Sequence, residues 1–440
     1  MDTIDFTIQK LGNASIKSPV ILSKKVNDFV AGYVSDDDMI INNVNVAAGS
    51  TITYSKKDLV EKAGPRELIY FDPVKVHAAI VTCGGLCPGL NNVIRAVVMS
   101  LWYVYGVRKI SGIRNGYRGF LPEYQLPVID LNPDVVSDIH KDGGTILGSS
   151  RGMGERVCEI VDCLDRMNVS MLFAIGGDGT QKGSLRISEE ISKRGLKISV
   201  VGIPKTIDND LSFIQKSFGF ETAVSKAVEA VSCAHTEARG AINGVSIVKL
   251  MGRESGFIAA HTSIASNDVN FALVPEVPFD LDGPNGLLEH LKHRVLKRNH
   301  AVIVAAEGAG QQYLCNDPSG KDASGNALLG DIGLFIKDRV TRYFRSEKID
   351  ANIRYIDPSY IIRSTAANPD DSIYCTRLGT NAVHAAMAGK TNMLVSLINN
   401  TFVHVPISLA VEKRNTIDPE GELWRDVIQA TGQPPLMKNA

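Results

Sequence analysis

The chain has 440 residues, a length that favours two or three domains, and its 44% apolar and 22% charged residues are ordinary for a globular protein with a large core. The net charge of −1 argues against general affinity for nucleic acid. Met1 to Asp5 lack the basic start of a signal peptide, and no apolar run approaches the roughly 18 residues of a membrane span. Seven cysteines without a tight pattern suit a reduced compartment. We therefore expect a cytoplasmic protein without membrane or nucleic-acid partners.

Residues 1–72 show no recognisable chemistry and are expected to form an N-terminal extension packed on the main body. From about Val76 the chain alternates short apolar strands with helices, which is the rhythm of doubly wound parallel sheets. The first such unit is strand His77–Thr82, a glycine loop at Gly84–Gly89 and a helix over Leu90–Val104. A glycine turn between strand and helix is often only a tight connection, so by itself it is a weak nucleotide signal.

A second run of small residues begins at Gly143 and leads to Arg151 and Gly152. Such a run suits a backbone nest in which a guanidinium faces a phosphate. A solvated arginine on a surface loop is an equally good interpretation of these residues alone.

Two loops at the centre of the chain carry the strongest pattern. Gly176–Thr180 follows the apolar run Met171–Ile175, and Pro204–Asp210 follows the apolar run Ile198–Ile203. Both runs read as buried parallel strands, and the carboxyl ends of such strands meet at one edge of the sheet, where open α/β sheets bind ligands. Glycines let the backbone close on a phosphate, and the helix that follows offers unpaired N–H groups.

The second half of the chain repeats this placement. Strand Val245–Leu250 runs into a loop over Met251–Gly256 that contains Arg253, and strand Ala301–Ala306 ends at Glu307. A further strand at Ile353–Ile356 leads to a segment with Tyr360 and Arg363. The sequence therefore predicts a second sheet with polar residues at its strand ends.

Phosphoryl transfer needs a cradle for the donor phosphates, a divalent cation and a base for the acceptor. Gly84–Gly85 and Gly177–Thr180 would supply the cradle. Asp178 would hold Mg²⁺, a cation that prefers oxygen ligands. Asp208 would accept the hydroxyl proton, and Arg151 and Arg253 would bind phosphoryl oxygens. The structural alternative for Asp208 and Asp210 is a turn whose carboxylates bond backbone N–H groups.

Four stretches, Gly84–Asn91, Gly176–Thr180, Pro204–Asp210 and Met251–Gly256, resemble the 6-phosphofructokinase family. The resemblance runs from about Ala63 to about Pro406. The Gly-Gly-Asp-Gly motif also occurs in dinucleotide and diacylglycerol kinases, whereas Pro-Lys-Thr-Ile-Asp-Asn-Asp followed by Met-Gly-Arg is highly specific. The long extension and the Cys-Gly-Gly-Leu-Cys-Pro-Gly loop are similar to the atypical ATP-using branch that is related to the pyrophosphate-dependent enzymes.

The resemblance implies a role for each matching residue. Asp208 is similar to the catalytic base, which acts with Arg253, Gly179 and Lys205, and Asp178 is similar to the Mg²⁺ ligand. The nucleotide site would comprise Gly84, Gly85, Arg151, Gly152, Gly177, Asp178, Gly179 and Thr180. The sugar-phosphate site would comprise Thr206, Ile207, Asp208, Asp210, Met251, Gly252, Arg253, Glu307, Arg354, Tyr360 and Arg363.

Three positions bear on the substrates. Pyrophosphate users have an aspartate where this chain has Gly179, so Gly179 favours ATP, whereas Lys205 resembles the pyrophosphate-type loop. We give Gly179 more weight because it decides whether a nucleotide fits. At the position of Gly244, relatives carry an arginine that reaches into a neighbouring subunit. This chain departs from the family pattern there.

By resemblance we expect two doubly wound, mostly parallel α/β domains facing each other across an active-site cleft. The expected domains are residues 73–220 with about 364–400 for the nucleotide, and 221–363 with about 401–440 for the sugar phosphate. The expected activity is glycolytic, ATP-dependent and allosteric phosphorylation of fructose 6-phosphate by a homodimer or homotetramer, with Arg354 reaching a neighbouring subunit. The alternatives are a pyrophosphate-dependent enzyme, a dinucleotide or lipid kinase, and a non-catalytic regulatory paralogue.

Overall fold

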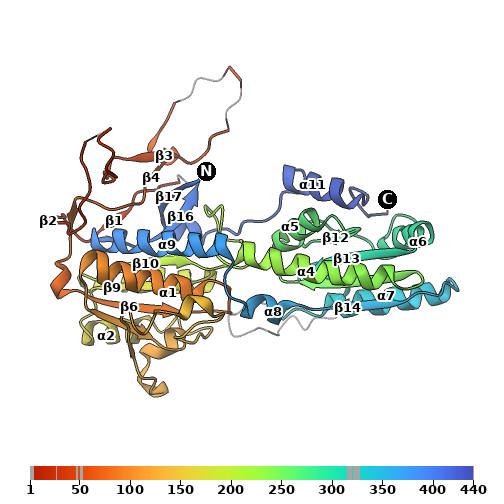
Figure 1. The fold of residues 1–440 in the computed structure, drawn as a ribbon, viewed down its shortest axis with the longest axis horizontal. Helices are drawn as coiled ribbons and strands as arrows, with labels where there is room; N and C mark the ends of the chain where they lie inside the picture. Colours follow the sequence, from red (N-terminus) through yellow and green to blue (C-terminus); the bar gives the residue numbers. More distant parts are fainter. Residues whose placement is uncertain are drawn as a thin grey trace. The chain divides into compact units, whose positions relative to one another are not determined.

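The computed structural model describes residues 4–439, except 26, 46, 47, 50–52, 315–319 and 321–327. The chain divides into two compact units. Unit 1 comprises Met1–Thr206, Leu211–Gly219 and Thr365–Arg414, and unit 2 comprises Ile207–Asp210, Phe220–Ser364 and Asn415–Ala440. Both units are built from strands and helices, as the α/β prediction requires (Figure 1).

Unit 1 is organised around a seven-stranded sheet in the order β17-β16-β10-β9-β6-β7-β8. The five inner strands pair in parallel, and the two edge strands are antiparallel to their neighbours. Every residue of β6, β9 and β10 is buried, which explains their continuous apolar sequence. The strand bounds are β6 His77–Thr82, β7 Lys109–Ile113, β8 Ile129–Asp130, β9 Met171–Gly176, β10 Ser199–Pro204, β16 Met393–Ile398 and β17 Thr401–Pro406.

Helices cover both faces of this sheet. Apolar residues of α2 (Val157–Arg166) and α3 (Asp178–Lys193) share a core with one face of β6, β9 and β10. The helix α9 (Pro369–Met387) runs along α1 (Leu90–Met99) and contacts β10 and β16 (Figure 1). The short α10 (Ile407–Ala410) follows β17. The predicted helix from Leu90 is shorter than expected, because the α-helical hydrogen bonding gives way to a π-helical turn at Ser100–Tyr105.

The N-terminal extension belongs to unit 1 and contains strands of three short antiparallel pairs, of which the first joins it to the main body and the other two lie within the extension. Strand β1 (Gln9–Lys10) pairs with β15 (Lys390–Thr391), β2 (Ile16–Lys17) with β5 (Leu68–Ile69), and β3 (Met39–Ile41) with β4 (Leu59–Glu61). Pairs of two or three residues provide few hydrogen bonds, so other contacts must hold the extension.

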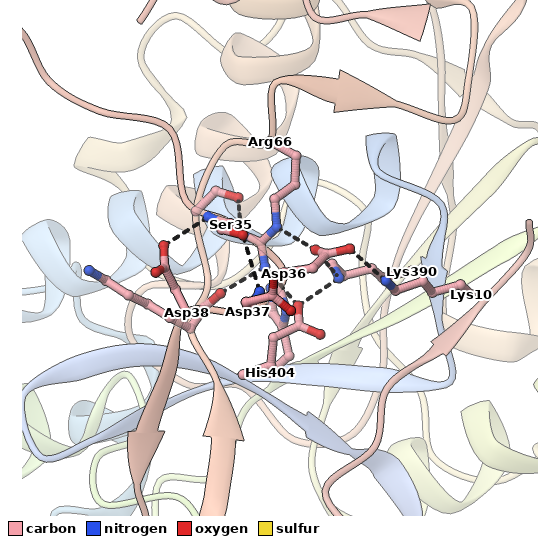
Figure 2. Close-up of polar contacts among 11 residues, drawn as sticks. Lys10, Ser35, Asp36, Asp37, Asp38, Arg66, Lys390 and His404 are labelled. Atoms are coloured by element: carbon pink, nitrogen blue, oxygen red, sulfur yellow. Dashed lines mark hydrogen bonds and ion pairs between the residues drawn. The ribbon is translucent and has the colours of Figure 1, made fainter. Parts of the chain in front are cut away.

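A cluster of charged side chains and one histidine supplies those contacts. We call Lys10, Asp36, Glu61, Arg66, Lys390 and His404 the ion cluster; Figure 2 shows five of them as labelled sticks. Arg66 lies 2.8 Å from Asp36 and 2.7 Å from Glu61, and Lys390 lies 2.9 Å and 2.6 Å from the same two carboxylates. The Nδ1 atom of His404 lies 2.8 Å from Glu61. Four members come from the extension and two from the main body, so the cluster ties the two together.

Unit 2 contains a four-stranded, fully parallel sheet in the order β12-β13-β11-β14. One face packs with apolar residues of α4, α5 and α11, and the other with those of α6 and α7. The bounds are β11 Gly244–Leu250, β12 Phe271–Leu273, β13 His300–Ala306, β14 Ile353–Ile356, α4 Phe220–Arg239, α5 Phe257–Ser266, α6 Leu287–Arg298, α7 Ile332–Ser346, α8 Ser359–Ser364 and α11 Glu422–Thr431. No described helix has the length and apolarity needed to span a membrane.

The observed division of the chain differs from the predicted one near residue 400. The segment Thr401–Pro406 was expected in the sugar-phosphate domain, but it forms β17 and pairs with β16 along its whole length in unit 1. A tight turn joins these two strands, and such a hairpin keeps consecutive strands in one sheet. After β17 the chain therefore returns to unit 2 only beyond Arg414.

Candidate active site

The Gly176–Thr180 loop joins the end of β9 to the start of α3. Gly177 is the N-cap of α3 with extended backbone, and its carbonyl accepts the backbone N–H groups of Thr180 and Gln181. Asp178 is the first helical residue, so its carboxylate lies at the positive end of the helix dipole. Its side chain is 18% exposed. Its Oδ2 atom lies 2.9 Å from Lys182 and 3.8 Å from Arg414.

The next residue of this loop, Gly179, faces open space. A Cβ atom built there would meet no heavy atom within 4 Å. The packing of the protein therefore does not require glycine at this position. A ligand that approaches the backbone closely is a physical reason for the missing side chain.

Lys205 contacts the glycine loop Gly84–Gly89 and is 7% exposed. Its ammonium donates to the carbonyl of Gly85 at 2.7 Å, and a Cβ at Gly84 would lie 3.3 Å from the same nitrogen. Gly84 has a φ of +89°, a conformation that favours glycine. A Cβ at Gly85 would lie 3.7 Å from the guanidinium of Arg151. The structure thus brings together four residues that the sequence placed on three separate segments.

Gln181 was not among the predicted site residues, although it holds the two central loops in register. It is fully buried, and its Nε2 atom donates to the carbonyls of Ala174, Gly176 and Ile203 at 3.3, 2.9 and 3.4 Å. The first two carbonyls lie at the end of β9 and the third at the end of β10. A polar residue on the buried face of a helix, directly after a glycine loop, is the sequence signal that could have identified it.

The acidic loop after β10 crosses from one unit to the other. Thr206 is buried in unit 1 and its carbonyl accepts the hydroxyl of Ser217, whereas Ile207 packs against the core of unit 2. The carbonyl of Asp208 accepts the hydroxyl of Ser255 at 3.2 Å. The carbonyl of Asp210 accepts the backbone N–H of Asn415 at 2.8 Å. The backbone that carries the two carboxylates is therefore held by unit 2.

In unit 2 the ends of β11 and β13 bring the Met251–Arg253 loop next to Glu307. The backbone N–H of Glu307 donates to the carbonyl of Leu250, and the backbone N–H of Gly308 donates to the carbonyl of Gly252, both at 2.9 Å. Gly252 has a φ of +126°, and a Cβ there would lie 2.4 Å from a backbone oxygen. The loop after β11 therefore depends on glycine at this position.

Tyr360 and Arg363 lie on α8, which follows β14. Tyr360 is 81% exposed and Arg363 is half-buried. Between them Ile362 is fully buried in the same core as Met251, so α8 and the Met251 loop share a support.

Arg354 lies on β14 and is exposed. It lines a surface hollow of about 520 Å³ together with Glu237 and Asp350. The nearby Gly244 has a structural reason to be glycine, because a Cβ there would lie 2.1 Å from the carbonyl oxygen of Ala238. An arginine at this position, which the resemblance led us to expect, would not fit without a shift of the backbone.

Two further observations concern metals and thiols. Among the described residues, no group of three or more His, Cys, Asp or Glu side chains is arranged to hold a metal ion. Cys83 and Cys87 are buried and not in a disulfide, and burial raises the pKa of Cys83 to about 12, so this thiol stays protonated. Both cysteines are therefore small packing residues of the loop.

Comparisons with known proteins identify the family. The phosphofructokinase family model matches residues 77–386. The whole chain is 58% identical to the ATP-dependent 6-phosphofructokinase of Borreliella burgdorferi and covers 99% of that protein. Over 98% of its length the chain is 46% identical to the ATP-dependent 6-phosphofructokinase of Amycolatopsis methanolica, and it covers 95% of that protein. A solved pyrophosphate-dependent phosphofructokinase from Marinobacter aquaeolei shares the fold at 21% identity, with a TM-score of 0.66 over 82% of this chain and 96% of that one. The chain therefore belongs to the phosphofructokinase family.

Proposed function

We propose that this protein is an ATP-dependent 6-phosphofructokinase that converts ATP and fructose 6-phosphate to ADP and fructose 1,6-bisphosphate. The observation that carries the proposal is the 58% identity, over the full length of both chains, to a protein with that name. The open space at Gly179 supports ATP as the donor, because an aspartate side chain there would occupy the room that an α-phosphate needs.

On the nucleotide side, the cradle consists mostly of backbone, to which two charged side chains are added. The proposed residues are Gly84, Gly85, Arg151, Gly152, Gly177, Asp178, Gly179 and Thr180. The start of α3 presents N–H groups to phosphate oxygens, and Arg151 offers a planar fork. Because Lys205 bonds the carbonyl of Gly85, its role includes supporting this loop, and that role is compatible with a nucleotide donor.

Asp178 fits a Mg²⁺ ion of the kind that phosphoryl-transfer enzymes use. Such an ion takes one or two carboxylates and fills its remaining positions with water and substrate phosphate oxygens, so a single half-buried carboxylate at a helix start is a suitable ligand. When bound, the ion neutralises charge on the transferred phosphoryl group.

On the sugar side, we assign Asp208 as the base. It takes the proton of the sugar 1-hydroxyl as that oxygen bonds to the γ-phosphorus, while the bond from that phosphorus to the β,γ-bridging oxygen breaks and ADP leaves. Arg253 stabilises the transferred group. The proposed contacts to fructose 6-phosphate are Thr206, Ile207, Asp210, Met251, Gly252, Glu307, Arg354, Tyr360 and Arg363, with Tyr360 and Arg363 at the 6-phosphate.

We further propose that the enzyme works in cytoplasmic glycolysis as a homo-oligomer in which Arg354 reaches a neighbouring subunit. Pyrophosphate as the donor is the second candidate, and Lys205 is the residue that favours it. Two assays with ATP and fructose 6-phosphate test the main proposal.

The wild type should form fructose 1,6-bisphosphate, measured by an aldolase-coupled assay. Asp208→Ser should lose roughly 10²–10⁴-fold in kcat, because the general base is removed, with little change in KM for fructose 6-phosphate. Unchanged turnover in Asp208→Ser would remove this aspartate from the mechanism, and an inactive wild type would refute the activity itself.

A further inference from the structure

One lysine of unit 2, Lys249, has none of the roles predicted from the sequence, although it lies close in the chain to the proposed sugar-phosphate residues. Lys249 is on β11, two residues before Met251, and its side chain is 14% exposed. Its ammonium lies 2.9 Å from Asp331 and 2.9 Å from Asp357. The three residues come from three separate elements of the unit.

The alternation of β11 explains why a lysine occupies this position. Val248 and Leu250 point into the core shared with α4 and α5, whereas Val245 and Ile247 point into the core shared with α7. Lys249 continues the second face, where it meets the start of α7 instead of solvent. Burying an ammonium there is costly unless it is paired, and the two carboxylates provide the pairing.

Each of these carboxylates also binds the start of a helix. Asp331 is the N-cap of α7, and its Oδ1 accepts the backbone N–H of Leu334 at 3.0 Å. Asp357 precedes α8, and its Oδ1 accepts the backbone N–H of Ser359 at 3.0 Å. In both residues the Oδ2 atom contacts Lys249. One lysine therefore connects strand β11 to the first residues of two helices.

The charges of this group reinforce one another. Burial disfavours the ammonium, but the two carboxylates outweigh burial and raise the pKa of Lys249 above its usual value. Burial opposes ionisation of Asp331 and Asp357 as well, and their hydrogen bonds still lower the pKa of each below its usual value. All three groups are charged at neutral pH, so the contacts persist under assay conditions.

We propose that Lys249 is a positioning residue for the sugar phosphate. Through Asp357 it holds the start of α8, and thereby Tyr360 and Arg363, against β11, which leads directly into the loop with Met251 and Arg253. The inference rests on the proposed function, because it needs these residues to bind fructose 6-phosphate. The middle of α8 has a separate support in Ile362, which is fully buried in the core that also contains Met251.

The group contains its own control, since Lys249 has one partner on α8 and one on α7. Asp357→Asn keeps a side-chain oxygen for the Ser359 N–H but weakens the attraction to Lys249. Asp331→Asn makes the same change at α7, which carries none of the proposed substrate residues. A second control is Lys292→Met on α6, because Lys292 is 18% exposed and pairs with Glu289 at 2.7 Å and Glu347 at 3.3 Å.

The test is steady-state kinetics of the full-length variants with fructose 6-phosphate and ATP varied separately. Lys249→Met and Asp357→Asn should raise KM for fructose 6-phosphate roughly tenfold, while kcat and KM for ATP change less than about twofold. Asp331→Asn and Lys292→Met should leave KM for fructose 6-phosphate within about twofold of the wild type. Lys249→Arg should recover most of the loss.

An unchanged KM for fructose 6-phosphate in both Lys249→Met and Asp357→Asn would overturn the inference. An equal rise in all four variants, or an equal rise in KM for ATP, would also overturn it, because either result indicates general destabilisation. If Lys249→Met does not fold, the comparison of Asp357→Asn with Asp331→Asn decides alone. Wild-type turnover separates the two proposals: an active wild type without the KM pattern refutes only the positioning role, whereas an inactive wild type refutes the function on which it rests.

Discussion

Replacing Lys390 by methionine tests whether the ion cluster holds the N-terminal extension. Lys390 is 1% exposed, and its ammonium bridges Glu61 at 2.6 Å and Asp36 at 2.9 Å. Methionine keeps a long unbranched side chain and removes only the charge and its hydrogen bonds. The change leaves two carboxylates that have lost a common cation.

The size of the effect follows from the burial of each partner. Removing one member of a buried ion pair costs roughly 3–5 kcal/mol, because the remaining charge stays buried and unpaired. Asp36 is 45% exposed and Glu61 keeps Arg66 at 2.7 Å, so we expect the lower end, about 3 kcal/mol. For a unit of this size each kcal/mol lowers Tm by roughly 2–4 °C, which predicts a drop of about 6–12 °C.

Differential scanning calorimetry at pH 7 measures this drop, and Lys10→Met is the matched control. Lys10 contacts the same Asp36 at 2.5 Å but is 44% exposed, so its loss should cost less than about 1 kcal/mol. Equal Tm shifts in the two variants would refute the argument that burial gives the cluster its strength. A Tm of Lys390→Met equal to that of the wild type would show that the cluster does not stabilise the extension.

Two other predictions concern pH and the donor site. Burial lowers the pKa of His404 to about 4, below its value of about 6.5 in the unfolded chain. Between these two pH values the unfolded state binds a proton that the folded state does not. The free energy of unfolding therefore falls as the pH drops from about 6.5 towards 4. Between pH 7 and pH 5 the wild type should therefore lose roughly 1–2 kcal/mol of unfolding free energy in urea titrations that His404→Gln does not lose, and parallel losses would contradict a neutral buried histidine. Gly179→Asp should keep the Tm of the wild type, because open space surrounds this position and an acidic side chain suits the first turn of a helix. The same variant should lose at least about tenfold in kcat/KM for ATP. Unchanged ATP kinetics would refute the assignment of Gly179 to the nucleotide site.

The sequence predicted several strands of the two sheets at or within one residue of their observed bounds. The strand at His77–Thr82 was predicted at its observed bounds, because an apolar run between turn residues has few other solutions. Asp178 was likewise placed at a strand-to-helix loop, and the structure makes it the first residue of α3. Local pattern was sufficient in these cases because neighbouring residues determine the conformation.

Partners that are distant in the chain could not be predicted from pattern. Thr401–Pro406 is recognisable as a strand, but its sequence does not reveal which sheet it joins. Residues 1–72 showed no recognisable chemistry, yet their Asp36 and Glu61 meet Lys390 more than 300 residues away. Lys249 and Asp331 are separated by 82 residues, so only the fold shows that they pair.

The most direct test of the central claim is turnover of fructose 6-phosphate by the wild type with Mg²⁺ and either ATP or pyrophosphate, measured side by side. We predict formation of fructose 1,6-bisphosphate with ATP and little or none with pyrophosphate, because Gly179 leaves room for a nucleotide. Turnover with pyrophosphate alone would contradict the donor assignment and make Lys205 the deciding residue. Turnover with neither donor would contradict the proposed function.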